Sequence, residues 1–338
     1  IHKAWQRKGL LSTLLFPLSC ITQCIVQRKR RYYQQHPDAV YTSHTPVIVV
    51  GNLVVGGAGK TPVVLALITA LRQHGYTPGV ISRGYGVRIG EHAHLSAQNT
   101  EANYLGDEPS LIAKETGVPV AVHPKRILAL QALNQAFPQI DVVIADDGLQ
   151  HLALQRDLEI IVQDERGIGN GLLLPAGPLR ESAGKLAEVD VVITNRNHQH
   201  IQRQAAENTT AKPLHIDMSL QPTAFVHVKT HQKQSLDDWL SQHKNKSIAA
   251  VAGIGNPQRF FNTLTDLGLA IEKQQAFPDH HAFQADDLTE LNQDLVLMTE
   301  KDALKCRHFA DERFYFLKVE AAFSDEDFFN KIERRLKF

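Results

Sequence analysis

Residues 47–62 read VIVVGNLVVGGAGKTP, an apolar strand that runs into a glycine-rich turn and then into a helical stretch. The glycines allow backbone N–H groups to turn inward around phosphate oxygens, Lys60 can neutralise the outer phosphates, and the Thr61 hydroxyl can ligate Mg²⁺. The following helix would direct its positive end at the same phosphates, with Pro62 tolerated in its first turn. The stretch therefore predicts a nucleoside triphosphate site, which consists of Gly56, Gly57, Ala58, Gly59, Lys60 and Thr61.

The glycine spacing of this loop is unusual. A glycine is expected five residues before Gly59, and Val54 stands there. The double glycine resembles the loop of partitioning-type ATPases, but the lysine that those proteins carry just before it is Val55 here. Phosphate binding is favoured over a merely structural turn because strand, loop, Lys-Thr pair and helix all agree. The reaction itself stays open at this point.

The composition is that of a globular protein with an uneven charge distribution. The chain has 338 residues, of which 43% are hydrophobic and 21% charged, enough for two modest domains. Its three cysteines form no zinc or disulfide pattern, which fits a reducing cytosol. Residues 1–31 hold seven of the 36 basic residues and none of the 36 acidic ones, so the remainder carries a net charge of −7. An acidic body argues against nucleic acid as a partner.

The basic N-terminal segment encloses an uncharged stretch, LLSTLLFPLSCITQCIV, at residues 10–26. It is marginally short for a spanning helix, contains Pro17 and lacks a small-residue cleavage site, so we expect neither a transmembrane segment nor a secretory signal. An interfacial membrane helix fits better, because its flanking cations would meet anionic headgroups. The alternative is a helix packed on the protein's own core.

Apolar runs of strand length alternate with helical stretches over the first two thirds of the chain. This order predicts an α/β fold with a doubly wound, largely parallel sheet of the P-loop type, whose ligands lie at the carboxyl ends of the strands. The expected strands are 47–50, 79–82, 118–122, 141–145, 158–162 and 189–194, and the expected helices include 62–74, 108–116 and 125–137.

A second, smaller α/β lobe is expected after a polar region at 195–245 in which strand signals weaken. Residues 247–268 repeat the order of strand, glycine turn and helix, and residues 314–317 indicate the last strand. We place a hinge or linker near 220–230. The predicted parts are an N-terminal membrane-associating helix (1–31), a nucleotide-binding domain (32–222), the smaller lobe (223–321) and a C-terminal helix (322–338).

Several polar residues follow the predicted strands and are candidates for chemistry. Asp146 and Asp147 end a buried run, where nucleotide enzymes hold Mg²⁺, although such a pair can also cap the next segment. Arg83 follows another strand and could reach phosphate. For Asp107, capping of a helix and catalysis are equally open. His280 follows Asp279, an arrangement that can hold a histidine in one tautomer for proton transfer, although such pairs are more often structural.

Eight motifs taken together resemble the tetraacyldisaccharide 4′-kinases of lipid A biosynthesis, over nearly the whole chain. The motifs are GNLVVGGAGKTP, SRGYG, GDEP, DDGLQH, LLPAGPLRE, AGIGNPQRF, FPDHHAF and MTEKDALK. The resemblance implies transfer of the γ-phosphate of ATP to the 4′-hydroxyl of a tetraacylated glucosamine disaccharide 1-phosphate, to give lipid IVA. It implies ATP and Mg²⁺ as cofactors, an acylated disaccharide lipid and an anionic membrane surface as partners, and the cytoplasmic face of the bacterial inner membrane as location.

The resemblance also implies roles for individual residues. Asp107 becomes the base for the sugar hydroxyl and His280 its partner, while Lys60 holds the β- and γ-phosphates. The metal set is Thr61, Asp146 and Asp147, and further active-site candidates are Glu181, Arg83 and His151. The alternative function is a membrane-associated, partitioning-type switch ATPase that phosphorylates no acceptor. MTEKDALK has no physical explanation from sequence.

Overall fold

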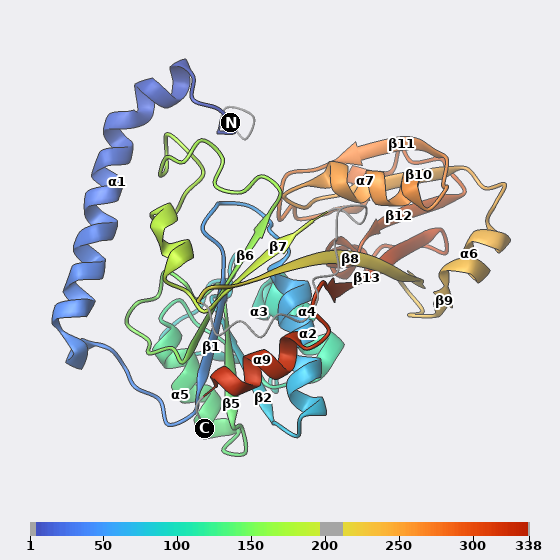
Figure 1. Ribbon diagram of the computed structural model, residues 1–338. Helices are drawn as coiled ribbons and strands as arrows, with labels where there is room; N and C mark the ends of the chain where they lie inside the picture. Colours follow the sequence, from blue (N-terminus) through green and yellow to red (C-terminus); the bar gives the residue numbers. More distant parts are fainter. Residues whose placement is uncertain (1–4, 197–211, 337–338) are drawn as a thin grey trace. The chain divides into compact units, whose positions relative to one another are not determined.

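The computed structural model describes residues 5–196 and 212–336, which form two compact units (Figure 1). The larger unit comprises residues 1–219 and 322–338, and the smaller unit comprises residues 220–321.

The larger unit is built on a largely parallel sheet with the strand order β8-β7-β6-β1-β5-β2-β4-β3, in which only β3 is antiparallel to its neighbour. The chain leaves β1 toward β2 and leaves β6 toward β7, on the opposite side. The carboxyl ends of β1 and its neighbours therefore mark the reversal of strand order at which such sheets bind ligands. The strands are β1 (Val47–Gly51), β2 (Pro78–Ser82), β3 (His94–Leu95), β4 (Val120–Val122), β5 (Val142–Asp146), β6 (Leu158–Asp164), β7 (Val191–Asn195) and β8 (Leu214–His227).

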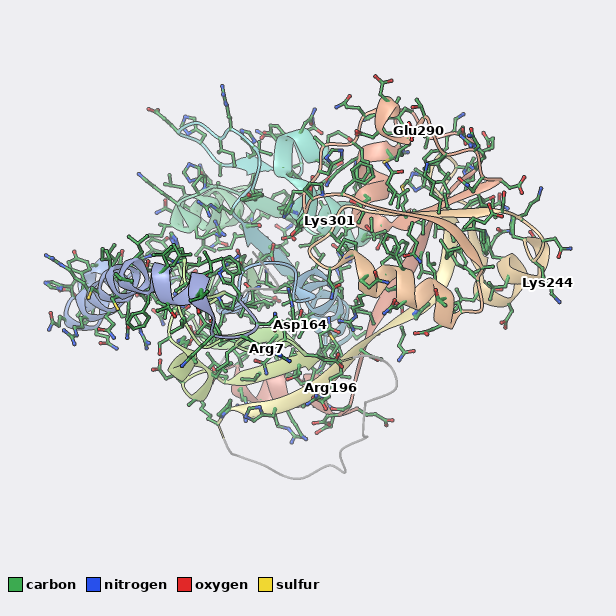
Figure 2. The ribbon with its side chains drawn as sticks, turned by 90° about the horizontal axis from the view of Figure 1, so that it is seen from above. Arg7, Asp164, Arg196, Lys244, Glu290 and Lys301 are labelled. Carbon is green, nitrogen blue, oxygen red and sulfur yellow. The ribbon has the colours of Figure 1, made fainter. Side chains whose placement is uncertain are left out.

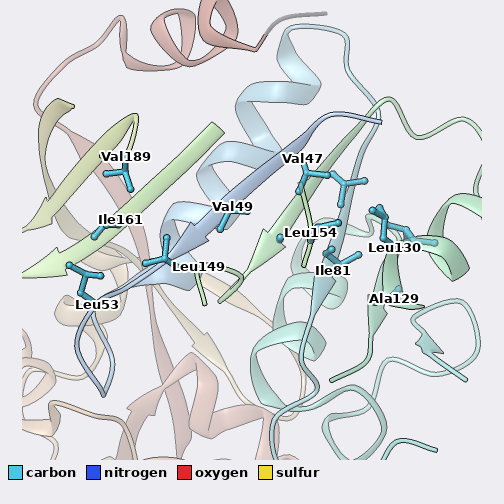
Figure 3. Packing of buried hydrophobic residues seen from close by; sticks show 14 of the residues in the cluster. Val47, Val49, Leu53, Ile81, Ala129, Leu130, Leu149, Leu154, Ile161 and Val189 are labelled. Atoms are coloured by element: carbon cyan, nitrogen blue, oxygen red, sulfur yellow. The ribbon is translucent and has the colours of Figure 1, made fainter. Parts of the chain in front are cut away.

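Helices cover both faces of this sheet, because successive strand residues bury their side chains on opposite sides. On one face Val47 and Val49 of β1 and Ile81 of β2 pack with Leu130 of α5 (Figure 3). The other face is covered by α2 and α4 (Figure 1). The helices of the unit are α1 (Leu10–Gln35), α2 (Lys60–Gln73), α3 (Ala102–Leu105), α4 (Asp107–Thr116), α5 (Arg126–Ala136) and α9 (Phe328–Arg335), with short 3₁₀ turns at Pro37–Ala39 and Ala183–Ala187.

α1 is, among the described residues, the one helix long and apolar enough to cross a membrane, with a mean hydropathy of 1.6 in its most apolar window. It is also attached to the larger unit along its length. Ser19 Oγ donates to the carbonyl oxygen of Leu173, Val26 packs against the core of Figure 3, and Arg30 pairs with Glu188.

The smaller unit has its own parallel strands, in the order β11-β10-β12-β13, with β8 beside β13 and β9 antiparallel to β8. The predicted strand, turn and helix at 247–268 are confirmed as β10 and α7, and the predicted last strand lies within β13. The elements are β9 (Lys233–Ser235), α6 (Leu236–Gln242), β10 (Ile248–Ala252), α7 (Pro257–Asp266), β11 (Ile271–Ala276), a 3₁₀ turn (Ala285–Leu288), β12 (Leu295–Thr299), α8 (Glu300–Cys306) and β13 (Phe314–Phe323).

The expectation of weak strand structure at 195–245 is wrong for β8, which runs for 14 residues. Its first part alternates in burial: Leu214, Ile216 and Met218 are buried, whereas His215 is exposed. This period-2 signal was hidden by the polar residues around it. β8 runs through the first part of the expected hinge or linker region, to His227, and the boundary between the two units, after Ser219, lies at the edge of that region. The hinge stays a prediction.

Candidate active site

The glycine loop between β1 and α2 is tied to the protein by its carbonyl groups. Asn52 Nδ2 donates to the carbonyl oxygen of Gly56 at 3.1 Å, and Arg166 Nη2 donates to that of Gly57 at 3.0 Å. Asn195 Nδ2 donates to the carbonyl oxygen of Ala58 at 3.1 Å. Because the C=O and N–H of one trans peptide unit point in opposite directions, the N–H groups that follow these carbonyls face away from these side chains. Successive backbone N–H groups that are turned away from the protein's own side chains in this way can donate together to one anion.

Gly59 is required at its position for two reasons. Its φ of +93° lies in the region that only glycine adopts readily, and a Cβ there would lie 2.4 Å from Asn195 Nδ2. The next residue, Lys60, begins α2 and is 9% exposed. The ammonium group of Lys60, which is shielded from solvent, and the N-terminus of α2 therefore both lie at the end of the glycine loop.

Lys60 shares the carboxylate of Asp147 with Arg180. Lys60 Nζ lies 3.5 Å from Asp147 Oδ1, and Arg180 Nη1 donates to both carboxylate oxygens at 2.9 and 3.0 Å. Burial alone would raise the pKa of Asp147, but the charges of Lys60 and Arg180 outweigh it and hold that pKa below its ordinary value. Asp147 is therefore a charged, paired carboxylate.

Asp146, one residue earlier, lies in a different environment. It ends β5 and is 1% exposed; Ser82 Oγ donates to its Oδ2 at 3.1 Å, while its Oδ1 has no hydrogen-bond partner among the described residues. Burial, with help from the charge of Glu108, raises the pKa of Asp146 to about 7 in spite of the nearby Lys60. A buried carboxylate oxygen without a donor is suited to a cation.

Asp107 is the first residue of α4, and Gly106 occupies the N-cap position without a side-chain cap. The expectation that Asp107 occupies the N-cap position is therefore wrong. Gly106 has a φ of +93°, and a Cβ there would lie 2.9 Å from the carbonyl oxygen of Tyr85. This close approach brings the start of α4 against the SRGYG loop after β2, which also carries the exposed Arg83.

Glu181 is buried, and His151, the residue after Gln150, is half-buried. Gln150 Nε2 donates to Glu181 Oε1 at 2.8 Å and to the carbonyl oxygen of Asn52 at 3.3 Å. Burial raises the pKa of Glu181, although Gln150 opposes the shift. Burial also lowers the pKa of His151 to about 4, so its ring is neutral at physiological pH.

His280 belongs to the smaller unit and has a φ of +62°. Its Nε2 lies 3.3 Å from Lys301 Nζ but 3.9 Å from Asp279 Oδ1, beyond hydrogen-bond distance. Of the two alternatives for the Asp279–His280 pair, a hydrogen bond from the ring Nε2 to the adjacent aspartate is not formed, and Lys301 is the nearer partner of that nitrogen. His281 pairs instead with Asp287 at 2.9 Å. The predicted partnership of His280 with Asp107 stays a prediction.

Four residues of the larger unit's site were missed by the sequence-based prediction of site residues. Arg126 is 3% exposed and donates to the backbone carbonyls of Asp146 and Asp147 at 3.4 and 3.2 Å; burial lowers its pKa to about 10. Three of the four stand at or shortly after the end of a parallel strand, so a systematic search of strand ends would have found those three. The missed residues are Arg126 after β4, Arg166 after β6, Arg180 beside the predicted Glu181, and Asn195 at the end of β7.

Comparison with known proteins identifies the family. The family model described as tetraacyldisaccharide-1-P 4′-kinase matches residues 11–337. The chain belongs to this family. The curated tetraacyldisaccharide 4′-kinase of Bordetella petrii is 49% identical over 338 residues, which cover 99% of this chain and 95% of that protein. The corresponding enzyme of Shewanella piezotolerans is 46% identical, with 95% and 92% covered.

A solved structure supports the same assignment. The crystal structure of the "apo" form of LpxK from Aquifex aeolicus in complex with ATP matches with a TM-score of 0.78 and 25% identity, covering 97% of this chain and all of that one. The predicted P-loop type of α/β fold is thereby confirmed. Membership of this family also disfavours a partitioning-type switch ATPase.

Proposed function

We propose that this chain phosphorylates the 4′-hydroxyl of tetraacyldisaccharide 1-phosphate with ATP as donor, and that the chemistry takes place at the carboxyl ends of β1, β2 and β5. The ATP-dependent 4′-kinase activity is that of the family to which the chain belongs. The observation that carries the location is the contact between Lys60, at the start of α2, and Asp147, which follows β5. Phosphoryl transfer needs charge neutralisation and positioning more than covalent help from the protein.

In this proposal the glycine loop binds the triphosphate. The N–H groups of residues 57–59 bind phosphate oxygens, and Lys60 exchanges its contact with Asp147 for the β- and γ-phosphates. Arg180 keeps Asp147 ionised when the lysine moves.

The residues at the end of β5 fit a divalent cation. Asp146 Oδ1 is buried without a donor, and Asp147 is held charged, which are properties of oxygen ligands for Mg²⁺. Asp146 and Asp147 would hold the ion together with the Thr61 hydroxyl. When bound, Mg²⁺ neutralises charge on the β- and γ-phosphate oxygens.

Asp107 accepts the proton of the sugar hydroxyl. It is the first residue of α4, where Gly106 occupies the N-cap position, and it lies next to the close approach of Gly106 to the backbone of Tyr85. His280, from the smaller unit, is the second group of the proposed acid–base pair. Glu181, Arg83 and His151 complete the proposed site as positioning residues.

The exposed face of α1 supports a peripheral position on a membrane surface, which in this proposal is the anionic, cytoplasmic face of the inner membrane. Leu10, Leu14 and Ile25 are 93%, 76% and 63% exposed, whereas Ser12 and Ser19 are buried against the protein. The helix thus presents its apolar side chains outward, the reverse of a helix that packs on a soluble core. Because Ser19 and Arg30 also attach it to the larger unit, we infer that α1 lies in the interface.

The assay that tests the reaction supplies γ-³²P-labelled ATP with tetraacyldisaccharide 1-phosphate in detergent. We expect label to reach the lipid, and Asp107→Asn to lower kcat by about 10²–10⁴-fold while leaving the KM for ATP nearly unchanged. Lys114→Met, which removes an ion pair with Glu101 in the last turn of the same helix, is the control and should transfer phosphate like the wild type. ATP turnover without labelled lipid would refute the kinase and favour the switch ATPase.

The membrane proposal is tested by sedimentation with vesicles that contain anionic lipid. Leu14→Gln combined with Ile25→Gln should weaken binding by about tenfold or more, because each change removes an apolar side chain from the interface. Gln23→Ala, another exposed residue of α1, should leave binding intact. Equal sedimentation of all three proteins would rule out an interfacial role for this face.

A further inference from the structure

The MTEKDALK motif forms the end of β12 and the start of α8, and it is bonded to the loop that carries His280. Thr299 caps α8: its Oγ1 accepts from Asp302 N at 3.3 Å and donates to Asp302 Oδ2 at 2.6 Å. The fully buried Asp302 in turn accepts a hydrogen bond from Gly253 N at 2.9 Å.

Gly253 connects this helix start to the histidine. While its N–H binds Asp302, its carbonyl oxygen accepts a hydrogen bond from His280 N at 3.3 Å. A second connection lies one turn further along α8, where Lys305 Nζ donates to the carbonyl oxygen of His281 at 3.1 Å. The backbone of the histidine loop, including the positive φ of His280, is thereby fixed relative to α8.

Lys301 stands next to Asp302 on this fixed framework and is labelled in Figure 2. Its side chain is 16% exposed, and its Nζ lies 3.3 Å from His280 Nε2 and 3.6 Å from Asp279 Oδ1. Lysine offers only donors, so in this contact Nε2 of the histidine is the acceptor. Asp279 compensates the charge of the shielded ammonium group.

We propose that Lys301 is a positioning residue for His280: its ammonium group donates to Nε2 and holds the neutral ring in the tautomer with the proton on Nδ1. A protonated ring would carry N–H groups on both nitrogens, so it would lose this hydrogen bond and face a like charge. Lys301 thus determines which nitrogen of His280 is available for the reaction. The inference rests on the proposed role of His280 in the transfer.

The direct readout is ¹H–¹⁵N NMR of the histidine rings, with the signal of His280 assigned by its loss in His280→Gln. The wild type should show His280 with its proton on Nδ1 at neutral pH. Lys301→Met should shift the ring toward the Nε2–H form, whereas Lys301→Arg should retain the wild-type pattern. Lys305→Met is the matched control, since it removes a lysine of the same helix whose Nζ donates to the backbone carbonyl oxygen of His281 and not to the His280 ring.

The activity readout is the pH profile of phosphate transfer. Lys301→Met should lower kcat about tenfold without changing the KM for ATP, the loss expected for one charged hydrogen bond. The charged groups that face the His280 ring within the smaller unit include Asp279 and Lys301. Lys301→Met removes the donor and the charge beside Nε2, so the acidic limb of its profile should differ from that of the wild type, whereas Lys301→Arg should retain the wild-type profile.

The outcomes separate the two proposals. An unchanged tautomer in Lys301→Met, or an unchanged acidic limb with an intact fold by thermal unfolding, overturns the role of Lys301. If Lys301→Met changes the tautomer but His280→Gln transfers phosphate as fast as the wild type, the contact between Lys301 and His280 is supported. The proposed function of His280 is then overturned.

Discussion

The chain builds a strand, a glycine turn and a helix twice, once at residues 47–73 and once at residues 248–266, and the two turns differ in the hydrogen bonds that their backbone makes. In the first, three loop carbonyls are bound by side chains, and Lys60 begins the helix. In the second, the N–H of Gly253 is bound by the protein's own Asp302, and Pro257, which has no N–H, begins the helix. The order of elements is thus no evidence of a phosphate site by itself. The side-chain bonds to the loop carbonyls and the lysine are what distinguish the first turn.

The largest effect should come from removing the lysine. Lys60→Ala should lower phosphate transfer by about 10²–10³-fold, because it removes a charge that stabilises the transferring phosphoryl group. Asn256→Ala is the matched change in the second turn, where the side chain caps α7. It should lower the free energy of unfolding by about 1 kcal/mol and leave transfer unchanged. The comparison fails if the two variants lose activity equally in the labelled-lipid assay.

The next effect concerns the glycines. Gly59→Ala should weaken ATP binding by about tenfold, because the new Cβ meets Asn195 in a backbone region that costs about 1–2 kcal/mol for other residues. Gly253→Ala would place its Cβ 3.1 Å from Asp302 Oδ1 and should lower stability without changing ATP affinity. Calorimetric titration with ATP distinguishes the two. If only Gly253→Ala weakened ATP binding, the phosphate site would have to be assigned to the second turn instead of the first.

A third change tests whether Asp302 is structural. Asp302→Ala leaves the N–H of Gly253 without its acceptor and should lower the free energy of unfolding by about 1–3 kcal/mol. Asp302→Asn keeps an acceptor oxygen and should cost less. Thermal unfolding measures both, and ATP affinity should stay at the wild-type value in each. A stable Asp302→Ala protein with reduced ATP affinity would mean that the second turn serves the nucleotide.

The smallest effect is a dependence of stability on pH that originates in the larger unit. The pKa of His151 is lowered by burial to about 4 from an ordinary value of 6.5. As the pH falls, the unfolded chain therefore protonates this histidine before the folded protein does. The free energy of unfolding keeps its full value above pH 6.5 and decreases as the pH falls toward 4. His151→Phe should flatten the slope in that window. His92→Phe, at an exposed position, should not.

The sequence predicted the parts of the fold whose signals are local. The apolar runs of the parallel strands, the glycine loop and the paired Asp146 and Asp147 needed only short-range patterns. The contact between Lys301 and His280 joins residues 21 positions apart through Gly253, and no local pattern reveals it. The role of the MTEKDALK motif also depends on a contact between distant residues, because Asp302 accepts the hydrogen bond of Gly253 N in the second glycine turn.

The difference between the two adjacent aspartates was also beyond the sequence. Their identical side chains acquire opposite pKa shifts because Asp147 faces Lys60 and Arg180, whereas Asp146 is buried with Glu108 nearby. Burial and charge partners of this kind are set by tertiary packing.

The most direct test of the account is hydrogen–deuterium exchange of the backbone amides in the presence and absence of ATP and Mg²⁺. Amides of residues 56–61 should become protected when ATP is added, because phosphate oxygens accept their hydrogen bonds, and this protection should be lost in Lys60→Ala. Protection confined to residues 253–258, with residues 56–61 unchanged, would contradict the assignment of the phosphate site to the first turn.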